Sequence, residues 1–302
     1  MSSPGSNSAL IRAMPVVFVL IWSTGFIVAK YGLPYAPPLT FLSIRYALSL
    51  LCFVAWIALA RVAWPQSRAQ WLHLGVTGIL IHAGYLGGVW SAIKGGMGSG
   101  LSALIVGLQP VLTAVWVSRM GDASQSENRV SARQWLGLGM GLAGLLLVVS
   151  RKFGAGDEAT PYTLLCAVVA LLSITAGTLY QKRFVKPADV RSANAIQLGA
   201  ALLVTLPFVF FEHEAVQWTP GFVGALAWSV LALTLGGSSL LYMLIQRGAA
   251  TAVTSLLYLV PPTTALMAWL LFGEAITVVT VLGTALTALG VWLVVRSVPR
   301  SA

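Results

Sequence analysis

Ten runs of about 20 mostly apolar residues, separated by short polar breaks, follow one another along the chain. An α-helix of that length crosses the ~30 Å hydrocarbon core of a bilayer. Only 9% of the 302 residues are charged, too few to cover the surface of a soluble protein of this size. The sequence therefore predicts an all-α membrane protein with ten transmembrane helices. We expect them over residues 11–31, 38–60, 71–93, 99–119, 132–150, 162–182, 192–211, 221–244, 250–272 and 276–296.

The lysines and arginines are distributed unevenly between the two sets of alternate breaks. Thirteen lie in one set, and the other set holds only Lys30, Lys94, Arg151 and Lys152. The positive-inside rule assigns the richer set, and with it both termini, to the cytoplasm. The first run lacks a small-residue cleavage site, so we expect it to be retained as a helix. Because the net charge of +10 sits in these breaks, the basic residues fit lipid head groups, and we expect no nucleic-acid partner.

Residues 22–121 recur faintly 152 positions later. The matched pairs include Gly25 and Gly177, Lys30 and Lys182, Pro110 and Pro262, Gly121 and Gly273, and Asp122 and Glu274. We therefore expect two five-helix units within one integral domain, at residues 11–150 and 162–296. Because each unit crosses the membrane an odd number of times, the second unit must be inverted relative to the first. Inverted repeats of this kind are typical of secondary transporters, whose substrate site lies near the bilayer midplane between the halves.

Two segments of the chain resemble the EamA-type drug/metabolite transporters. The first runs from Trp22 to Lys30 (WSTGFIVAK) and is followed by Pro38 and Arg45; the second is the run LFGE that ends at Glu274. The resemblance implies a ten-helix carrier with a central cavity and cytoplasmic termini. The chain looks most like the YddG-type exporters of aromatic and other neutral amino acids, which implies a small-molecule substrate, alternating access and a bacterial-type inner membrane. The alternative is an exporter of another small metabolite or drug with the same fold.

Polar and aromatic side chains on the predicted helices are candidates to line the cavity, because polar groups are costly in hydrocarbon. A stripe at steps of three or four, on one face of a helix, is formed by Ser99, Ser102, Val106, Gln109 and Thr113. Aromatic rings offer apolar area with a polar handle and can cap an ammonium group. The predicted substrate contacts are Trp22, His82, Tyr85, Trp90, Ser102, Gln109, Ser238, Tyr242 and Tyr258. For each residue the alternative is ordinary helix packing.

Five residues are predicted to act in gating or in structure. Arg45 is charged and lies well inside a predicted helix, where it can hold a substrate carboxylate or bond neighbouring carbonyls; we favour a structural or gating role. Lys30 lies near the outer surface, where its amine can simply reach water. Pro110, Pro261 and Pro262 interrupt two helices related by the repeat, which is typical of a substrate site or hinge, whereas the alternative is a kink that neighbouring helices repair.

No aspartate or glutamate lies deep in a predicted helix. Their absence argues against export of lipophilic cations and against proton coupling, because His82 is then the only side chain deep in a predicted helix that titrates near neutral pH. We therefore favour facilitated export down a gradient. The sequence has no HExxH motif and no pair of in-helix aspartates, so it predicts no enzyme, metal or cofactor. Gly137 and Gly141 are spaced for close helix contact, either in a dimer or, as we favour, within a monomer.

Overall fold

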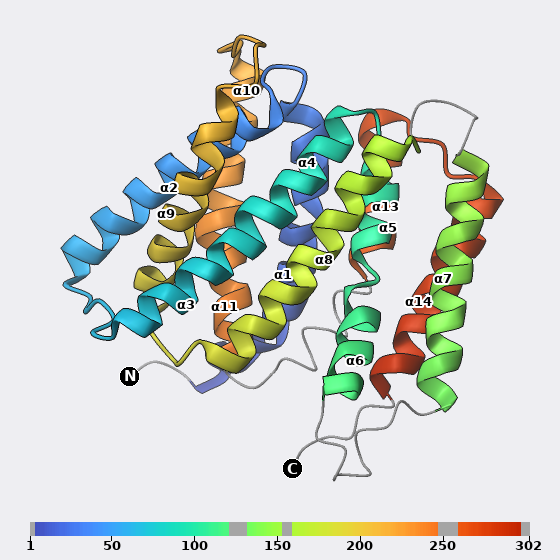
Figure 1. Ribbon diagram of the computed structural model, residues 1–302, viewed down its shortest axis with the longest axis horizontal. Helices are drawn as coiled ribbons and strands as arrows, with labels where there is room; N and C mark the ends of the chain where they lie inside the picture. The colour runs from blue at the N-terminus through green and yellow to red at the C-terminus, as the bar shows by residue number, and fades with distance from the viewer. Residues whose placement is uncertain (1–3, 121–131, 153–158, 247–258, 297–302) are drawn as a thin grey trace.

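The computed structural model describes residues 4–120, 132–152, 159–246 and 259–296. Every regular element in those ranges is a helix (Figure 1). In chain order the helices are α1 (Pro4–Gly32), α2 (Pro38–Ala60), α3 (Arg68–Gly78), η1 (Ile79–Leu86), α4 (Gly87–Lys94), α5 (Ser99–Val106), α6 (Gln109–Met120), α7 (Ala132–Lys152), α8 (Pro161–Phe184), α9 (Val190–Val209), α10 (Pro220–Trp228), η3 (Ser229–Ser238), α11 (Ser239–Gln246), α13 (Val260–Phe272) and α14 (Val278–Arg296). The segments η1 and η3 are π-helices, each continuous with the α-helices on either side.

Five helical segments are long and apolar enough to cross a membrane: Pro38–Ala60, Arg68–Lys94, Pro161–Phe184, Val190–Val209 and Pro220–Tyr242. The shorter apolar helices are Val16–Gly32, Ser99–Thr113, Trp135–Ser150, Val260–Phe272 and Val278–Leu293. The chain is therefore a multi-pass, all-helical membrane protein, as the apolar runs predict. Residues 250–258 of the helix predicted at 250–272 lie outside the described residues. That the chain crosses the membrane ten times therefore stays a prediction.

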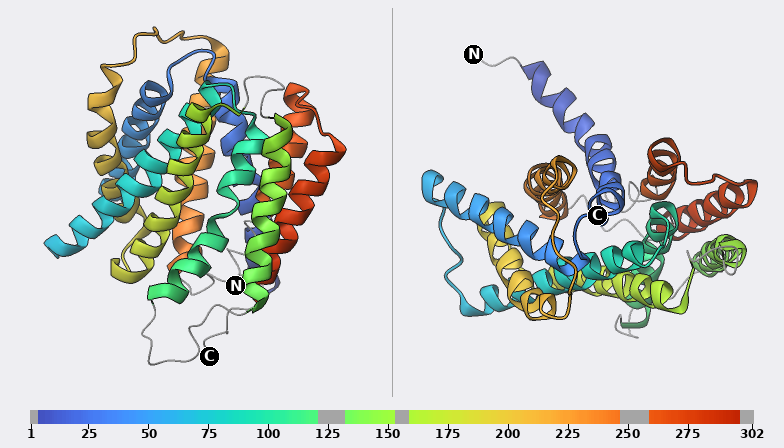
Figure 2. Two further views of the ribbon diagram at one scale, coloured as in Figure 1. Left: turned by 45° about the vertical axis from the view of Figure 1, so that its right-hand side comes forward. Right: turned by 90° about the horizontal axis from the view of Figure 1, so that it is seen from above.

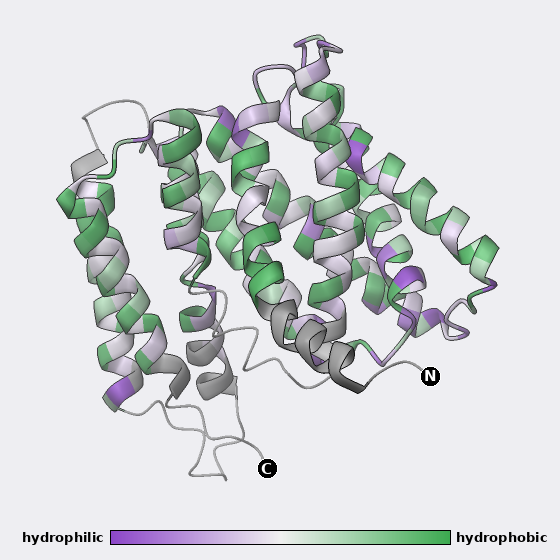
Figure 3. Ribbon diagram, turned by 180° about the vertical axis from the view of Figure 1, so that it is seen from behind, coloured by the Kyte–Doolittle hydropathy of each residue, from purple (hydrophilic) through white to green (hydrophobic). Residues whose placement is uncertain are grey.

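Large apolar side chains cover the outward faces of the helices. Leu51 and Leu59 on α2 and Leu203 on α9 are examples of such exposed side chains. Figure 3 shows hydrophobic residues along most of the length of the helical ribbons. Such a surface suits hydrocarbon, and the backbone polar groups are satisfied within the helices, as a bilayer demands.

The helices pack in pairs, and the main pairings follow the internal repeat. At one edge α14 packs along α7, and at the opposite edge α2 packs along α9 (Figures 1 and 2). Between these edges α8 packs against η1 and α4, while α1 packs against α10 and η3. The first turns of α1 and the last turns of α14 lie at the same end of the bundle (Figure 1). This arrangement leaves α1 and the two π-helices in the middle of the molecule.

Glycines allow α7 and α14 to meet backbone to backbone. A Cβ placed on Gly144 would lie 2.5 Å from Thr287 Oγ1 and 2.8 Å from Thr287 N, a clash that only glycine avoids. Gly290 is equally close to Gly141, whose carbonyl oxygen accepts a hydrogen bond from Thr287 Oγ1 at 3.3 Å. The small-residue face predicted to serve helix packing is therefore used inside one chain.

Candidate functional site

A cavity lies where α1, α2, η1 and α4 meet η3, so its walls come from both parts of the repeat. The lining residues are Trp22, Gly25, Phe26, Arg45, Ile81, His82, Tyr85, Leu86, Val89, Trp90, Leu233 and Ser238. Predicted substrate contacts and Arg45 thus share one space. The cavity measures about 40 Å³, which holds a few waters but not an amino acid. A substrate therefore fits only when these helices move apart.

The two π-helices supply half of this lining. Under the 152-residue repeat, residues 79–86 fall on 231–238, so the wide turns occur at the same place in both halves. Within η3, Thr234 Oγ1 donates to Ser229 O at 2.9 Å, and Ser238 Oγ donates to Leu233 O at 3.4 Å. Both acceptors lie five residues earlier in the chain, the spacing of a π-helical turn. Such turns are rare and frequently mark functional sites.

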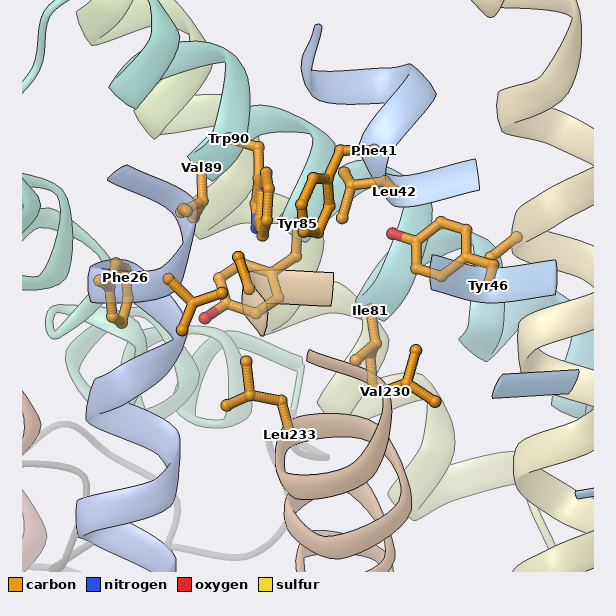
Figure 4. Packing of buried hydrophobic residues seen from close by; sticks show 14 of the residues in the cluster. Phe26, Phe41, Leu42, Tyr46, Ile81, Tyr85, Val89, Trp90, Val230 and Leu233 are labelled. Carbon is orange, nitrogen blue, oxygen red and sulfur yellow. The ribbon is translucent and has the colours of Figure 1, made fainter. Parts of the chain in front are cut away.

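Aromatic rings form much of the apolar wall. Trp90 is buried beside Phe41, with the ring centroids 4.4 Å apart. Tyr85 reaches across the same region, and Figure 4 shows its hydroxyl pointing toward the side on which Phe26 and Val89 lie. Rings arranged in this way offer a flat apolar surface together with an occasional polar tip, which suits a ligand with its own ring or aliphatic body.

Arg45 joins this wall from α2 and is only 4% exposed. Its Nε donates to Thr234 Oγ1 on η3 at 3.0 Å. The hydroxyl of the next residue, Tyr46, donates to the carbonyl oxygen of His82 on η1 at 2.8 Å. These two hydrogen bonds tie α2 to both π-helices, so the arginine sits where the cavity walls are connected.

A second polar cluster lies at one end of the bundle, two helical turns beyond Trp22 along α1. Lys30 Nζ lies 2.7 Å from Glu274 Oε1 and 5.2 Å from the centre of the Phe272 ring. The same carboxylate accepts from the backbone N–H groups of Ser99 at 3.0 Å and Gly100 at 3.5 Å, at the start of α5. Glu274 therefore combines an ion pair with capping of a helix N-terminus.

The backbone places Glu274 for this role. Gly273 ends α13 in the left-handed conformation, with φ of 65°, which glycine adopts at little cost. The chain therefore turns back at once and brings Glu274 over α5. Ser99 adds a further link, because its hydroxyl donates to the carbonyl oxygen of Phe26, a cavity residue on α1, at 3.1 Å. We call Lys30, Glu274 and the first residues of α5 the end latch.

Three other predicted substrate contacts lie away from the cavity lining. Ser102 is buried on α5. Gln109 begins α6 and donates from Nε2 to Thr178 Oγ1 on α8 at 3.0 Å. Tyr242 on α11 is buried in a separate cluster that contains Leu74. Tyr258 falls outside the described residues.

The predicted proline positions lie at helix starts. Pro110 is the second residue of α6, and Pro261 and Pro262 follow Val260 in the first turn of α13. A proline there lacks only an N–H group that has no partner within the helix. The interruption before α6 falls at Gly107, on which a Cβ would lie 2.8 Å from Pro261 Cγ. The break between α5 and α6 therefore touches the first turn of α13.

Sequence reasoning missed three parts of the site: the π-helices, Thr234 as the partner of Arg45, and the capping role of Glu274. A π-helical turn has no simple periodic signature, and Arg45 and Thr234 are 189 positions apart. For Glu274 a signal was present, because it falls on Asp122 under the repeat, directly after a glycine in both halves.

Known proteins resemble the chain over nearly its full length. The sequence profile of the EamA-like transporter family matches residues 11–150 and again residues 161–296. The uncharacterized transporter YoaV of Bacillus subtilis is 24% identical over 91% of this chain and 92% of its own length. The uncharacterized inner membrane transporter YedA of Escherichia coli K12 is 26% identical over 85% and 81%. A probable amino-acid metabolite efflux pump of Salmonella typhimurium is 25% identical over 93% of each chain. A crystal structure that is 20% identical shares the fold, with a TM-score of 0.67 over 93% of this chain and 95% of that one.

Proposed function

Because the chain belongs to the EamA-like transporter family, we propose that it exports neutral amino acids, aromatic ones in particular, across a bacterial-type inner membrane. The observation that carries this proposal is the cavity walled by Trp22, Tyr85 and Trp90, where both repeats contribute side chains. Two relatives named probable amino-acid metabolite efflux pumps, from Salmonella typhimurium and Escherichia coli K12, support the substrate class. A ring or aliphatic side chain packs on such walls, and an ammonium group can lie over a ring face.

Transport by this molecule is proposed to proceed by alternating access within a monomer, with two inverted units rocking about the cavity. The end latch, which includes the predicted gating residue Lys30, closes the cavity on one side. The distribution of basic residues supports an orientation with that side outside the cell and both termini in the cytoplasm. Among the described residues no carboxylate lines the cavity, which favours export down a gradient over a proton-coupled exchange.

Counterflow in proteoliposomes tests this function. Proteoliposomes that contain the purified full-length protein are loaded with unlabelled phenylalanine, leucine, uridine or a cationic dye, and uptake of the labelled form of the same compound is followed. We expect trans-stimulated uptake of the two amino acids, with phenylalanine faster, and no effect of a pH gradient. Uptake of only uridine or the dye would replace the proposal with export of another metabolite or a drug.

The variant Trp90→Ala gives the matching site test, with Trp56→Ala as its control. Trp56 is an exposed tryptophan on α2 that does not line the cavity. We expect the first substitution, and not the second, to lower phenylalanine counterflow per protein molecule. Equal counterflow in both variants would remove the aromatic wall as the reason for the substrate preference.

A further inference from the structure

Arg45 has hydrogen-bonding capacity that the described part of the chain leaves unused. It is 4% exposed, lines the cavity, and uses its Nε for Thr234. In the described residues its two terminal nitrogens, which carry four N–H groups, have no hydrogen-bond or ion-pair partner. A guanidinium stays charged in proteins, and a buried cation without a counter-ion is costly. The structure therefore presents a fixed positive charge at the wall of a cavity of about 40 Å³.

The carboxylates of the described residues have partners away from Arg45. Within the described residues, Glu274 pairs with Lys30 and Glu214 with Lys94, each near a helix end. Asp189 pairs with Arg191, and Glu212 accepts from the backbone at the start of α2. The remaining acidic residues are Asp122, Glu127, Asp157 and Glu158, which lie outside the described residues and, in the sequence, in breaks between the predicted helices. Among the described residues no carboxylate is therefore left to neutralise Arg45, and a ligand can supply one.

We propose that Arg45 binds the carboxylate of the transported molecule, so that the cavity selects monocarboxylates with an apolar body. The bond from Nε to Thr234 fixes one edge of the guanidinium plane and leaves the terminal nitrogens for a carboxylate, whose two oxygens match that spacing. The body of the ligand then packs against the aromatic wall formed by Trp22, Tyr85 and Trp90. This inference rests on the proposed function, because it names the group by which the same cavity recognises an amino acid.

The chemistry also ranks ligands that share a phenyl group. Phenylalanine and 3-phenylpropionate carry a carboxylate, whereas phenylalaninamide and 2-phenylethylamine do not. An ammonium group finds no acidic partner in the described cavity lining, and at most lies over a ring face. The carboxylate, not the ammonium group, is therefore expected to decide binding, and 3-phenylpropionate should bind without any ammonium group.

The test is equilibrium binding of these four probes to the purified full-length protein in detergent, followed by tryptophan fluorescence. We expect the two carboxylates to bind at least about tenfold more tightly than the two compounds without one, since hydrogen bonds to charged groups are the strong ones. This comparison needs no variant. Equal binding of phenylalanine and phenylalaninamide, or no binding of either carboxylate, would overturn the inference.

Variants then assign the effect to Arg45. Arg45→Gln should weaken the binding of phenylalanine and 3-phenylpropionate by about tenfold or more and leave the binding of phenylalaninamide unchanged. If the glutamine variant does not fold, Arg45→Lys replaces it, because lysine keeps the positive charge. This variant should still bind the two carboxylates more tightly than the two other compounds, but by a smaller factor. Lys94→Gln, at an exposed lysine outside the cavity, is the matched control and should behave as wild type. A folded Arg45 variant that binds both carboxylates as wild type does would exclude the role.

The proposed function and this inference fail in different ways. If carboxylates bind in an Arg45-dependent way but phenylalanine shows no counterflow, the proposal of amino-acid export is wrong and the role of Arg45 as a carboxylate site stands. Phenylalanine counterflow with the same KM in wild type and Arg45→Gln would retain the exporter and remove the role of Arg45.

Discussion

Replacing Glu274 with glutamine removes the charge of the end latch and keeps its shape. The side chain of Glu274 is 11% exposed and that of Lys30 is 35% exposed, so the ion pair is partly shielded from water. Loss of the pair is expected to cost about 0.5–1 kcal/mol, and loss of the negative charge at the N-terminus of α5 a similar amount. The sum of about 1–2 kcal/mol corresponds to a 5–30-fold rise in the population open at this end.

Thiol labelling measures that population directly. In a background with Cys52→Ser and Cys166→Ser, the cavity residue Ser238 is replaced by cysteine and exposed to a membrane-impermeant maleimide added on the side of Lys30. When the open form is the minor one, the labelling rate follows its population, so Glu274→Gln should label about 5–30 times faster. Lys30→Gln should act in the same direction.

The matched control is a second Lys–Glu pair near helix ends. Lys94 and Glu214 are 31% and 62% exposed, and such a pair contributes little. Lys94→Gln should therefore label at nearly the wild-type rate. An equal acceleration in Lys94→Gln, or none in Glu274→Gln, would refute the assignment of the gate to Glu274 and Lys30.

Two further predictions concern stability. Gly144→Ala should lower the Tm in detergent, because its Cβ meets Thr287 and overpacking costs about 1–3 kcal/mol. The control Gly139→Ala should keep or raise the Tm, because nothing lies within 4 Å of its Cβ. Equal Tm values in the two variants would show that α7 and α14 do not pack this closely. Glu212→Ala should also lower the Tm, by the equivalent of about 1 kcal/mol, because its carboxylate accepts from the N–H groups of Leu39 and Thr40 at the start of α2. Glu214→Ala is its control, and a similar loss in both variants would exclude the cap as the cause.

The helices could be predicted because an apolar run of about 20 residues has few alternatives in lipid. The helix expected at 38–60 is α2 (Pro38–Ala60), which starts with a proline in its first turn, where no hydrogen bond is lost. Gly273 belongs to the LFGE run singled out in the sequence, and its left-handed backbone explains why α13 ends there. Local rules of this kind fix where helices begin and end.

The cavity could be predicted only in part. Trp22, His82, Tyr85 and Trp90 were expected to meet in one space and do so. The stripe from Ser99 to Thr113 was assigned to the same space because it is polar, yet the hydroxyl of Ser99 bonds α1 and Gln109 bonds α8. A hydrogen bond to a neighbouring helix satisfies a polar side chain as well as a wet cavity does. Periodicity therefore shows which residues share a face, but not what that face meets.

The extra residue in each π-helical turn changes the direction in which the side chains after it point. In a regular α-helix, Tyr85 and Trp90 are five residues apart and would point about 140° away from each other. Trp90 lies in α4, directly after the wide turns of η1, and both rings nevertheless border one space. Deleting a single residue between 79 and 86 would let the segment rewind as a plain α-helix and swing Trp90 by roughly a quarter-turn or more. The shape of the cavity wall thus depends on the number of residues in this segment as well as on their side chains.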